Sequence, residues 1–193
     1  MIIRKMYKFE NAHIVRSCSS RRCKTSIHGH SYRCEVLLHS NFLDNAEMVY
    51  DFGLMKLGIK TLIDSFDHAT TIYSGDSEEY KNDIKKHSLR WVEVPYNPSA
   101  EQFCRFFFVM IDRLISLSIM QNGEREVKLH SIIVHETDTG YAQCFREDAY
   151  NPNMGTINLE EFEFSDEIIS EWEDKELFKK LINGTKIEFP KEC

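Results

Sequence analysis

The sequence has no basic excess over most of its length, and this argues against a nucleic-acid partner. Of its 193 residues, 31 are Asp or Glu and 24 are Lys or Arg, for a net charge of −7 at pH 7. Residues 159–193 contain 11 of the acids and 5 of the bases, so residues 1–158 are close to neutral. With no basic stripe in the sequence, we expect neither DNA nor RNA as a partner.

The sequence also lacks a long uninterrupted apolar run. Its most apolar stretch, residues 103–120, is interrupted by Arg105, Asp112 and Arg113, which is typical of a core helix and not of a membrane span. Residues 1–7 do not contain the apolar stretch of a signal peptide. We therefore expect a cytoplasmic protein with no membrane partner.

The six cysteines follow none of the spacings of small zinc-binding modules. A chain of this length buries a sufficient core without disulfides, and thiols in the cytoplasm are expected to be reduced. Cys18 and Cys23 are the one pair close enough in sequence to leave this question open.

What the sequence does contain is a regular series of short apolar segments. Hydrophobic residues make up 42% of the chain, with 13 Phe and 8 Tyr, which is enough for a real core. Their spacing predicts strands over residues 3–13, 30–39, 127–135 and 141–146, helices over about 51–66 and 99–120, and a polar loop over 74–90. Ser99 and Gln102 form a capping box at the start of the second helix. This order predicts an α+β fold, a four-stranded antiparallel sheet with two helices on one face.

The chain divides at about residue 150 in this interpretation. Residues 1–150 contain all of these elements and are expected to form one domain. Residues 151–193 are expected to be an acidic C-terminal extension. Its apolar spacing over 166–182 predicts an amphipathic helix that packs on the body of the protein or on a neighbouring subunit. Nothing in the extension suggests chemistry.

Three histidines are expected to meet where the first two strands pair. His28 and His30 are two residues apart at the start of a strand, so their side chains point to the same side, and Gly29 leaves room between them. His13 ends the preceding strand, which a hairpin places beside the start of the next. Three imidazoles suit zinc and leave its fourth position open for substrate or water, as catalytic sites require.

Two other interpretations of these histidines stay open. A His-x-His pair in a strand is often only an exposed polar pair or a core hydrogen-bonding pair. Alternatively, Cys18 or Cys23 supplies a fourth ligand and makes the zinc site structural.

Five sequence blocks occur in order between residues 3 and 147. They are Phe9-Glu10-Asn11-Ala12-His13 with Cys23 and His28-Gly29-His30-Ser31-Tyr32; Val49-Tyr50-Asp51-Phe52-Gly53-Leu54-Met55-Lys56; Phe66-Asp67-His68; Pro98-Ser99-Ala100-Glu101; and Val134-His135-Glu136-Thr137. Together they resemble the 6-pyruvoyltetrahydropterin synthase and 6-carboxytetrahydropterin synthase family. Any one block alone is a weak signal, whereas five in register are specific.

This resemblance implies a fold, an assembly and a reaction. The fold is the tunnelling fold, whose sheets join across subunits into a barrel, and the expected assembly is a homo-oligomer, commonly a dimer of trimers. The reaction is that of a zinc-dependent lyase acting on 7,8-dihydroneopterin triphosphate, with Zn²⁺ held by His13, His28 and His30.

The resemblance also implies roles for individual residues. Cys23 is the base that removes a proton from the substrate side chain, although Cys18 in the same loop is an alternative. Asp67 and His68 form the dyad that completes proton transfer, and Glu136 anchors the pterin and takes part in the charge relay. A variant that uses glutamate as the base is disfavoured, since no acidic residue occurs from 14 to 27.

Two further groups of residues are implied less specifically. Glu101 is a further candidate pterin contact, although its place in a first helical turn is already explained by the helix dipole. The basic residues of the loop that could bind the triphosphate are Arg16, Arg21, Arg22 and Lys24.

The product is the remaining question at this level. One reaction of the family releases acetaldehyde and triphosphate and feeds queuosine synthesis, whereas the other eliminates triphosphate and keeps the three-carbon chain. We favour the first, because Asp51-Phe52 and the spare loop are closer to the bacterial queuosine branch. An alternative of another class is a non-catalytic zinc- or pterin-binding protein.

Overall fold

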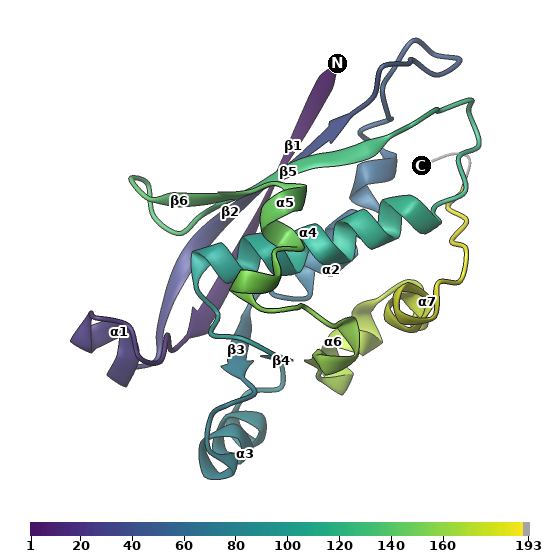
Figure 1. Cartoon of the computed structure of the whole chain (residues 1–193). Helices are drawn as coiled ribbons and strands as arrows, with labels where there is room; N and C mark the ends of the chain where they lie inside the picture. The colour runs from purple at the N-terminus through teal and green to yellow at the C-terminus, as the bar shows by residue number, and fades with distance from the viewer. Residues whose placement is uncertain (191–193) are drawn as a thin grey trace.

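The computed structural model describes residues 1–190, in which the main helices lie on one face of a twisted sheet (Figure 1). The strand order is β6-β5-β2-β1-β3-β4-β7. The bounds of the strands are β1 (Ile2–His13), β2 (His28–His39), β3 (Ala69–Tyr73), β4 (Trp91–Val94), β5 (Lys128–His135), β6 (Tyr141–Cys144) and β7 (Glu163–Phe164). The mixed α+β class predicted from the sequence is therefore confirmed.

The predicted number of strands is wrong. The four expected strands form an antiparallel sheet in the order β6-β5-β2-β1, but β3, β4 and β7 extend it to seven strands. β3 runs parallel to both β1 and β4, so the sheet is mixed. These added strands are two to five residues long, which is too short for a recognisable alternation of apolar and polar side chains.

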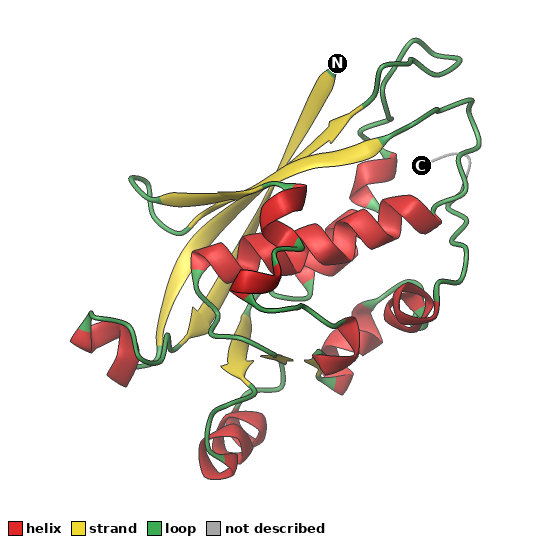
Figure 2. Ribbon diagram, in the orientation of Figure 1, coloured by secondary structure: helices red, strands yellow, loops and turns green. Residues whose placement is uncertain are grey.

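The helix α4 (Ala100–Leu117) crosses the sheet and forms the centre of the core (Figure 2). It begins as predicted, because the Ser99 hydroxyl accepts a hydrogen bond from the Gln102 amide at 3.4 Å. The first predicted helix is shorter than expected: a 3-10 turn (Leu54–Lys56) precedes α2 (Gly58–Asp64). At Gly58 a Cβ atom would lie 2.7 Å from the Phe189 ring, so any larger residue would force this side chain to shift.

The polar segment 74–90 is not a loop, as predicted, but contains α3 (Glu78–His87). Ser77 caps this helix by accepting a hydrogen bond from the Tyr80 amide. Acidic residues lie in its first turn and basic residues in its last, and these charges stabilise the helix by interacting favourably with its dipole. A further short helix, α1 (Arg21–Thr25), lies in the loop between β1 and β2.

The predicted helix over 166–182 is in fact two short helices, α6 (Asp166–Glu171) and α7 (Leu177–Asn183). They are separate because Trp172 adopts an extended backbone with φ −67° and ψ 134°. Before them come α5 (Arg146–Ala149) and two 3-10 turns (Pro152–Met154 and Leu159–Glu161). The predicted apolar side packs on the body of the protein, since Ile168, Trp172, Leu177 and Leu181 join the same hydrophobic core as α4.

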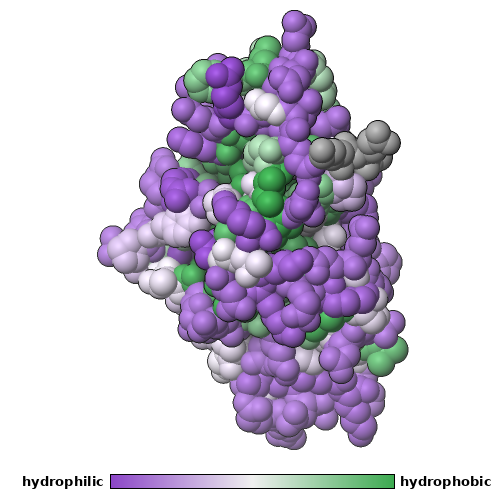
Figure 3. Space-filling view, turned by 90° about the vertical axis from the view of Figure 1, so that its right-hand side faces the viewer, coloured by the Kyte–Doolittle hydropathy of each residue, from purple (hydrophilic) through white to green (hydrophobic). Residues whose placement is uncertain are grey.

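The surface seen in Figure 3 is mainly hydrophilic, with apolar side chains in smaller patches between polar ones. None of the helices within residues 1–190 has both the length and the apolar character needed to cross a membrane.

Candidate metal centre

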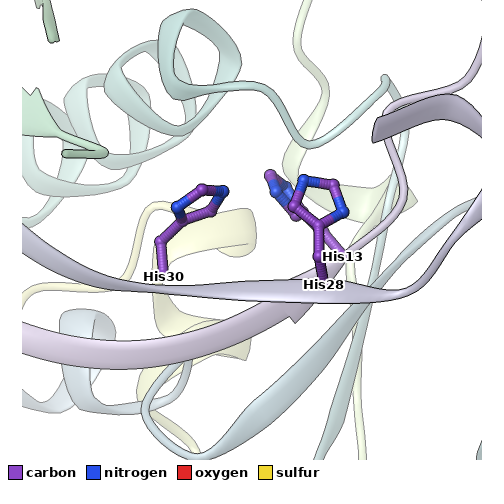
Figure 4. A group of neighbouring side chains, drawn as sticks. All are labelled: His13, His28 and His30. Atoms are coloured by element: carbon purple, nitrogen blue, oxygen red, sulfur yellow. The ribbon is translucent and has the colours of Figure 1, made fainter. Parts of the chain in front are cut away.

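The pairing of β1 with β2 brings the three histidines together. In this register His13 lies directly opposite His28, and Asn11 lies opposite His30. Side chains alternate between the faces of a strand, so all three imidazoles project from one face of the sheet (Figure 4). Their metal-binding atoms lie within 4.8 Å of one another.

Backbone carbonyls orient two of the imidazoles. His13 Nδ1 lies 2.5 Å from the Pro98 carbonyl oxygen, and His28 Nδ1 lies 3.0 Å from that of Ser26. A carbonyl oxygen can only accept, so each Nδ1 carries the proton and each Nε2 keeps its lone pair. This tautomer leaves Nε2 free to bind a metal ion, and it is imposed from outside the group of three.

Burial favours the neutral form of two of the histidines. The His13 side chain is fully buried, and this lowers its pKa to about 4; the hydrogen bond to Pro98 opposes the shift, and His28 and His30 add to it. Burial also lowers the pKa of His30, against the attraction of Glu136. Neutral imidazoles are the form that binds zinc. Among the described residues the group contains no cysteine, so the donor set fits an ion with an open position.

Glu136 lies beside this centre, as expected for a residue of the same site. Its Oε1 atom is 3.7 Å from His30 Nε2 and 3.9 Å from His13 Nε2. It also accepts a hydrogen bond from the buried Tyr32 hydroxyl at 3.3 Å. Burial, together with the nearby carboxylate, raises the pKa of Tyr32, which therefore stays protonated as a donor.

Cys23 lies in α1, within the loop that joins His13 to His28. It is half-buried, and its carbonyl oxygen accepts a hydrogen bond from the Val15 amide at 3.1 Å, which ties α1 to the end of β1. Cys18 and Cys23 are both free thiols, and the Cys18 thiol donates to the Ser20 carbonyl oxygen.

Asp67 and His68 are in contact with each other but not with the three histidines. His68 Nδ1 lies 2.9 Å from Asp67 Oδ2, and the His68 side chain is 74% exposed. His68 lines a cavity of about 330 Å³ together with Glu10 and Ser31. Asn11 and His30 also line this cavity. The side chains of Glu10 and Ser31 alternate with those of Asn11 and His30, so they project from the face of the sheet opposite to the imidazoles.

The remaining candidate residues are not gathered at the centre. Glu101 is exposed in the first turn of α4, and no contact connects it with the three histidines. Arg16 is bound to Asp76 at 2.5 Å and packs on Tyr80, so its charge is already compensated. Arg21, Arg22 and Lys24 are exposed on α1.

Sequence reasoning missed two contributors to the centre. One is the Tyr32 hydroxyl, to which the sequence analysis assigned no role. Tyr32 lies two residues after His30 in the same strand, and this spacing indicates that its side chain shares the imidazole face. The other is the Pro98 carbonyl group, whose contact with His13 cannot be predicted from the sequence. Every residue has a backbone carbonyl, and this one is 85 residues away from His13.

Comparison with known proteins agrees with this geometry. The family model described as 6-pyruvoyl tetrahydropterin synthase matches residues 2–147. The chain is 42% identical over 187 residues to the 6-carboxy-5,6,7,8-tetrahydropterin synthase of Helicobacter pylori strain J99, covering 96% of this chain and 94% of the relative. A protein of the same name from Aquifex aeolicus is 31% identical over 125 residues, covering 63% of this chain and 75% of the relative.

Solved structures share the fold at lower identity. An uncharacterized protein of Wolinella succinogenes is 20% identical with a TM-score of 0.59, covering 76% of this chain and 98% of that chain. The 6-pyruvoyl tetrahydropterin synthase of Caenorhabditis elegans is 19% identical with a TM-score of 0.53, covering 75% of this chain and 94% of that chain. From the match over residues 2–147 and the identity to the H. pylori relative, this chain belongs to the 6-pyruvoyl tetrahydropterin synthase family.

Proposed function

We propose that this protein is a zinc-dependent 6-carboxy-5,6,7,8-tetrahydropterin synthase. It is a lyase that converts 7,8-dihydroneopterin triphosphate to 6-carboxytetrahydropterin, acetaldehyde and triphosphate, in queuosine (deazapurine) biosynthesis in the cytoplasm. The observation that carries the proposal is the group of three histidines, two of them oriented by backbone carbonyls. The name of a relative 42% identical over nearly the whole chain supports the choice of reaction.

His13, His28 and His30 are the residues that hold zinc in this proposal. The chemistry that a bound zinc supplies is Lewis acidity toward the oxygens of the substrate side chain, which makes its C–H bonds more acidic. The protein's part is to hold the three imidazoles together with metal-binding nitrogens directed at one point. Pro98 and Ser26 do this by fixing the protons of His13 and His28 on Nδ1.

Cys23 is the proposed base, and the short helix that carries it is basic. Arg21, Arg22 and Lys24 stand within two residues of it on the same short helix. Glu136 is the proposed pterin anchor, because a carboxylate can accept two parallel hydrogen bonds from the aminopyrimidinone edge. Tyr32 fixes one of its oxygens by donating to Oε1. The role of Glu101 in pterin binding rests on the family resemblance alone.

Asp67 and His68 complete the proton transfer in this proposal. Asp67 accepts from His68 Nδ1–H, which leaves Nε2 of His68 available to exchange a proton with the substrate. Within one chain the His68 side chain is 74% exposed and shares its cavity with Glu10 and Ser31, whose side chains lie on the face opposite to the imidazoles. We therefore propose a homo-oligomer, a dimer of trimers, in which the dyad serves the site of a neighbouring subunit. Residues 1–150 form the synthase domain and residues 151–193 extend it, in keeping with a family match that ends at 147.

The test is product analysis. The zinc-loaded protein is incubated with 7,8-dihydroneopterin triphosphate, and acetaldehyde and triphosphate are quantified. Release of both in equal amounts is expected. Triphosphate without acetaldehyde would instead indicate the pyruvoyl-forming reaction of the family, and neither product would indicate a binding protein.

A variant pair tests the role of Cys23. Cys23→Ala is expected to keep its zinc and lose turnover by at least about 100-fold, since general-base catalysis contributes at least that much. Cys18→Ala is the matched control from the same loop and is expected to retain activity. Loss of zinc from Cys23→Ala would make this cysteine a ligand and contradict its role as the base.

A further inference from the structure

The turn that carries Asp67 and His68 has an unfavourable backbone conformation. His68 has a φ of 51°, in the left-handed region that a non-glycine residue occupies only when its surroundings hold it there. Two backbone contacts with Glu10 hold one side of the turn. The His68 amide donates to the Glu10 carbonyl oxygen at 2.7 Å, and the Glu10 amide donates to Asp67 Oδ1 at 2.7 Å.

Arg90 holds the other side of the turn. Its Nε donates to the Asp67 carbonyl oxygen and its Nη2 to the Asp64 carbonyl oxygen, both at 2.9 Å. The third nitrogen, Nη1, lies 2.5 Å from Glu171 Oε2 at the end of α6, in an ion pair that lacks the geometry of a hydrogen bond. Because a guanidinium group is a rigid plane, the attraction of this carboxylate for one corner acts on the whole group and so on the other two donors.

Trp172 secures the chain just before the turn. Its indole Nε1 donates to the Ser65 hydroxyl at 2.9 Å, and both side chains are buried. Ser65 donates in turn to the Thr61 carbonyl oxygen at 2.8 Å, at the end of α2. Trp172 also packs edge-on against Phe164 of β7, and Phe164 contacts Phe66.

We propose that the C-terminal extension is a positioning device for the Asp67–His68 dyad, acting through Glu171 on Arg90 and through Trp172 on Ser65. The extension lies outside the family match at 2–147, but the match to the H. pylori relative covers 96% of this chain and so includes most of it. The inference rests on the proposed function, since the dyad is catalytic only if that function holds. Glu171 and Trp172 belong neither to the three-histidine group nor to the lining of the cavity beside His68.

The test uses Glu171→Gln, which removes the charge beside Arg90, and Trp172→Phe, which removes the indole donor and keeps an aromatic ring. Glu173→Gln is the matched control, an exposed glutamate two residues further on. Two properties are measured in zinc-loaded, full-length protein: kcat and KM for acetaldehyde release, and hydrogen exchange of peptides covering 64–70, with a peptide from α4 as internal reference.

Both variants are expected to lower kcat about 10-fold or more, since small misplacement of catalytic groups is costly. KM, zinc content and exchange in α4 are expected to stay at wild-type values, while exchange over 64–70 becomes faster. A purely structural role of the extension would instead speed exchange in α4 as well.

The outcomes separate this inference from the proposed function. Wild-type kcat and wild-type exchange over 64–70 in both variants would overturn the inference even in an active enzyme. If the wild-type protein releases no acetaldehyde, the proposed function fails. In an inactive protein, faster exchange over 64–70 would still support the contact between extension and turn, and unchanged exchange would overturn it. In an active enzyme, faster exchange with a wild-type kcat would overturn the positioning role. Should Trp172→Phe not fold, Glu171→Gln provides the same readouts from an exposed position.

Discussion

Replacing Asp76 by Asn is expected to loosen the loop that carries Cys23. Arg16 stands at the start of this loop, and its Nε lies 2.5 Å from Asp76 Oδ1. Its guanidinium group packs on the Tyr80 ring at 4.8 Å, and its backbone amide donates to Asn97 Oδ1 at 2.8 Å. The Asp76 side chain is only 6% exposed and that of Arg16 31%, so this is a largely buried ion pair.

The magnitude follows from this burial. A hydrogen bond to a charged group contributes about 1.5–3 kcal/mol, and the amide of Asn retains a neutral acceptor in the same place. The local cost of Asp76→Asn is therefore about 1–2 kcal/mol, which makes opening of the loop about 5- to 30-fold more frequent. Activity is expected to fall with it, because Cys23 is then misplaced for part of the time.

The assay is amide exchange at Val15, whose N–H bonds to the Cys23 carbonyl oxygen only when the loop is closed. Faster exchange at Val15, together with a lower kcat, is expected for Asp76→Asn. Asp83→Asn makes the same chemical change at an exposed position of α3 and is expected to resemble the wild type. Unchanged exchange in Asp76→Asn would refute the reasoning that Arg16 and Asp76 hold this loop.

Three further changes address the metal, the pterin anchor and the response to acid. His28→Ala is expected to weaken zinc binding by at least about 100-fold in competition with a chromogenic chelator, and wild-type affinity would contradict its place as a ligand. Glu136→Gln is expected to lower kcat/KM about 10- to 100-fold, mainly through KM, because a charge-assisted pair becomes a neutral one; an unchanged KM would argue against pterin anchoring. Burial alone would raise the pKa of Glu35, but hydrogen bonds from His135 and Arg4 outweigh it and hold this pKa below its usual value. A carboxyl group whose pKa is lower in the folded state stabilises the fold at neutral pH, and this contribution is lost as the pH falls below about 4.5. In urea titrations, Glu35→Gln is therefore expected to lose less stability on acidification than the wild type.

The three-histidine group could be predicted from the sequence because it depends on local geometry. His13, His28 and His30 belong to one hairpin, and strand alternation alone places their side chains on one face. The capped start of α4 was predictable for the same reason, since Ser99 and Gln102 are three residues apart. The start of α3 also carried a local signal in Ser77 and the acids that follow it, although the polar composition of the segment favoured a loop.

Contacts between distant segments were decided only by the tertiary structure. The addition of β3 beside β1 in a parallel arrangement places His68 beside Glu10 and Ser31, and no spacing in the sequence encodes that pairing. The Pro98 carbonyl group that orients His13 is a backbone atom 85 residues away. The sequence of the extension predicts only an acidic helix. The packing of the core is what brings Glu171 to Arg90 and Trp172 to Ser65, beside the turn that contains Asp67. Sequence patterns determined the chemistry available to this protein, whereas long-range packing determined which groups share a face and how firmly each is held.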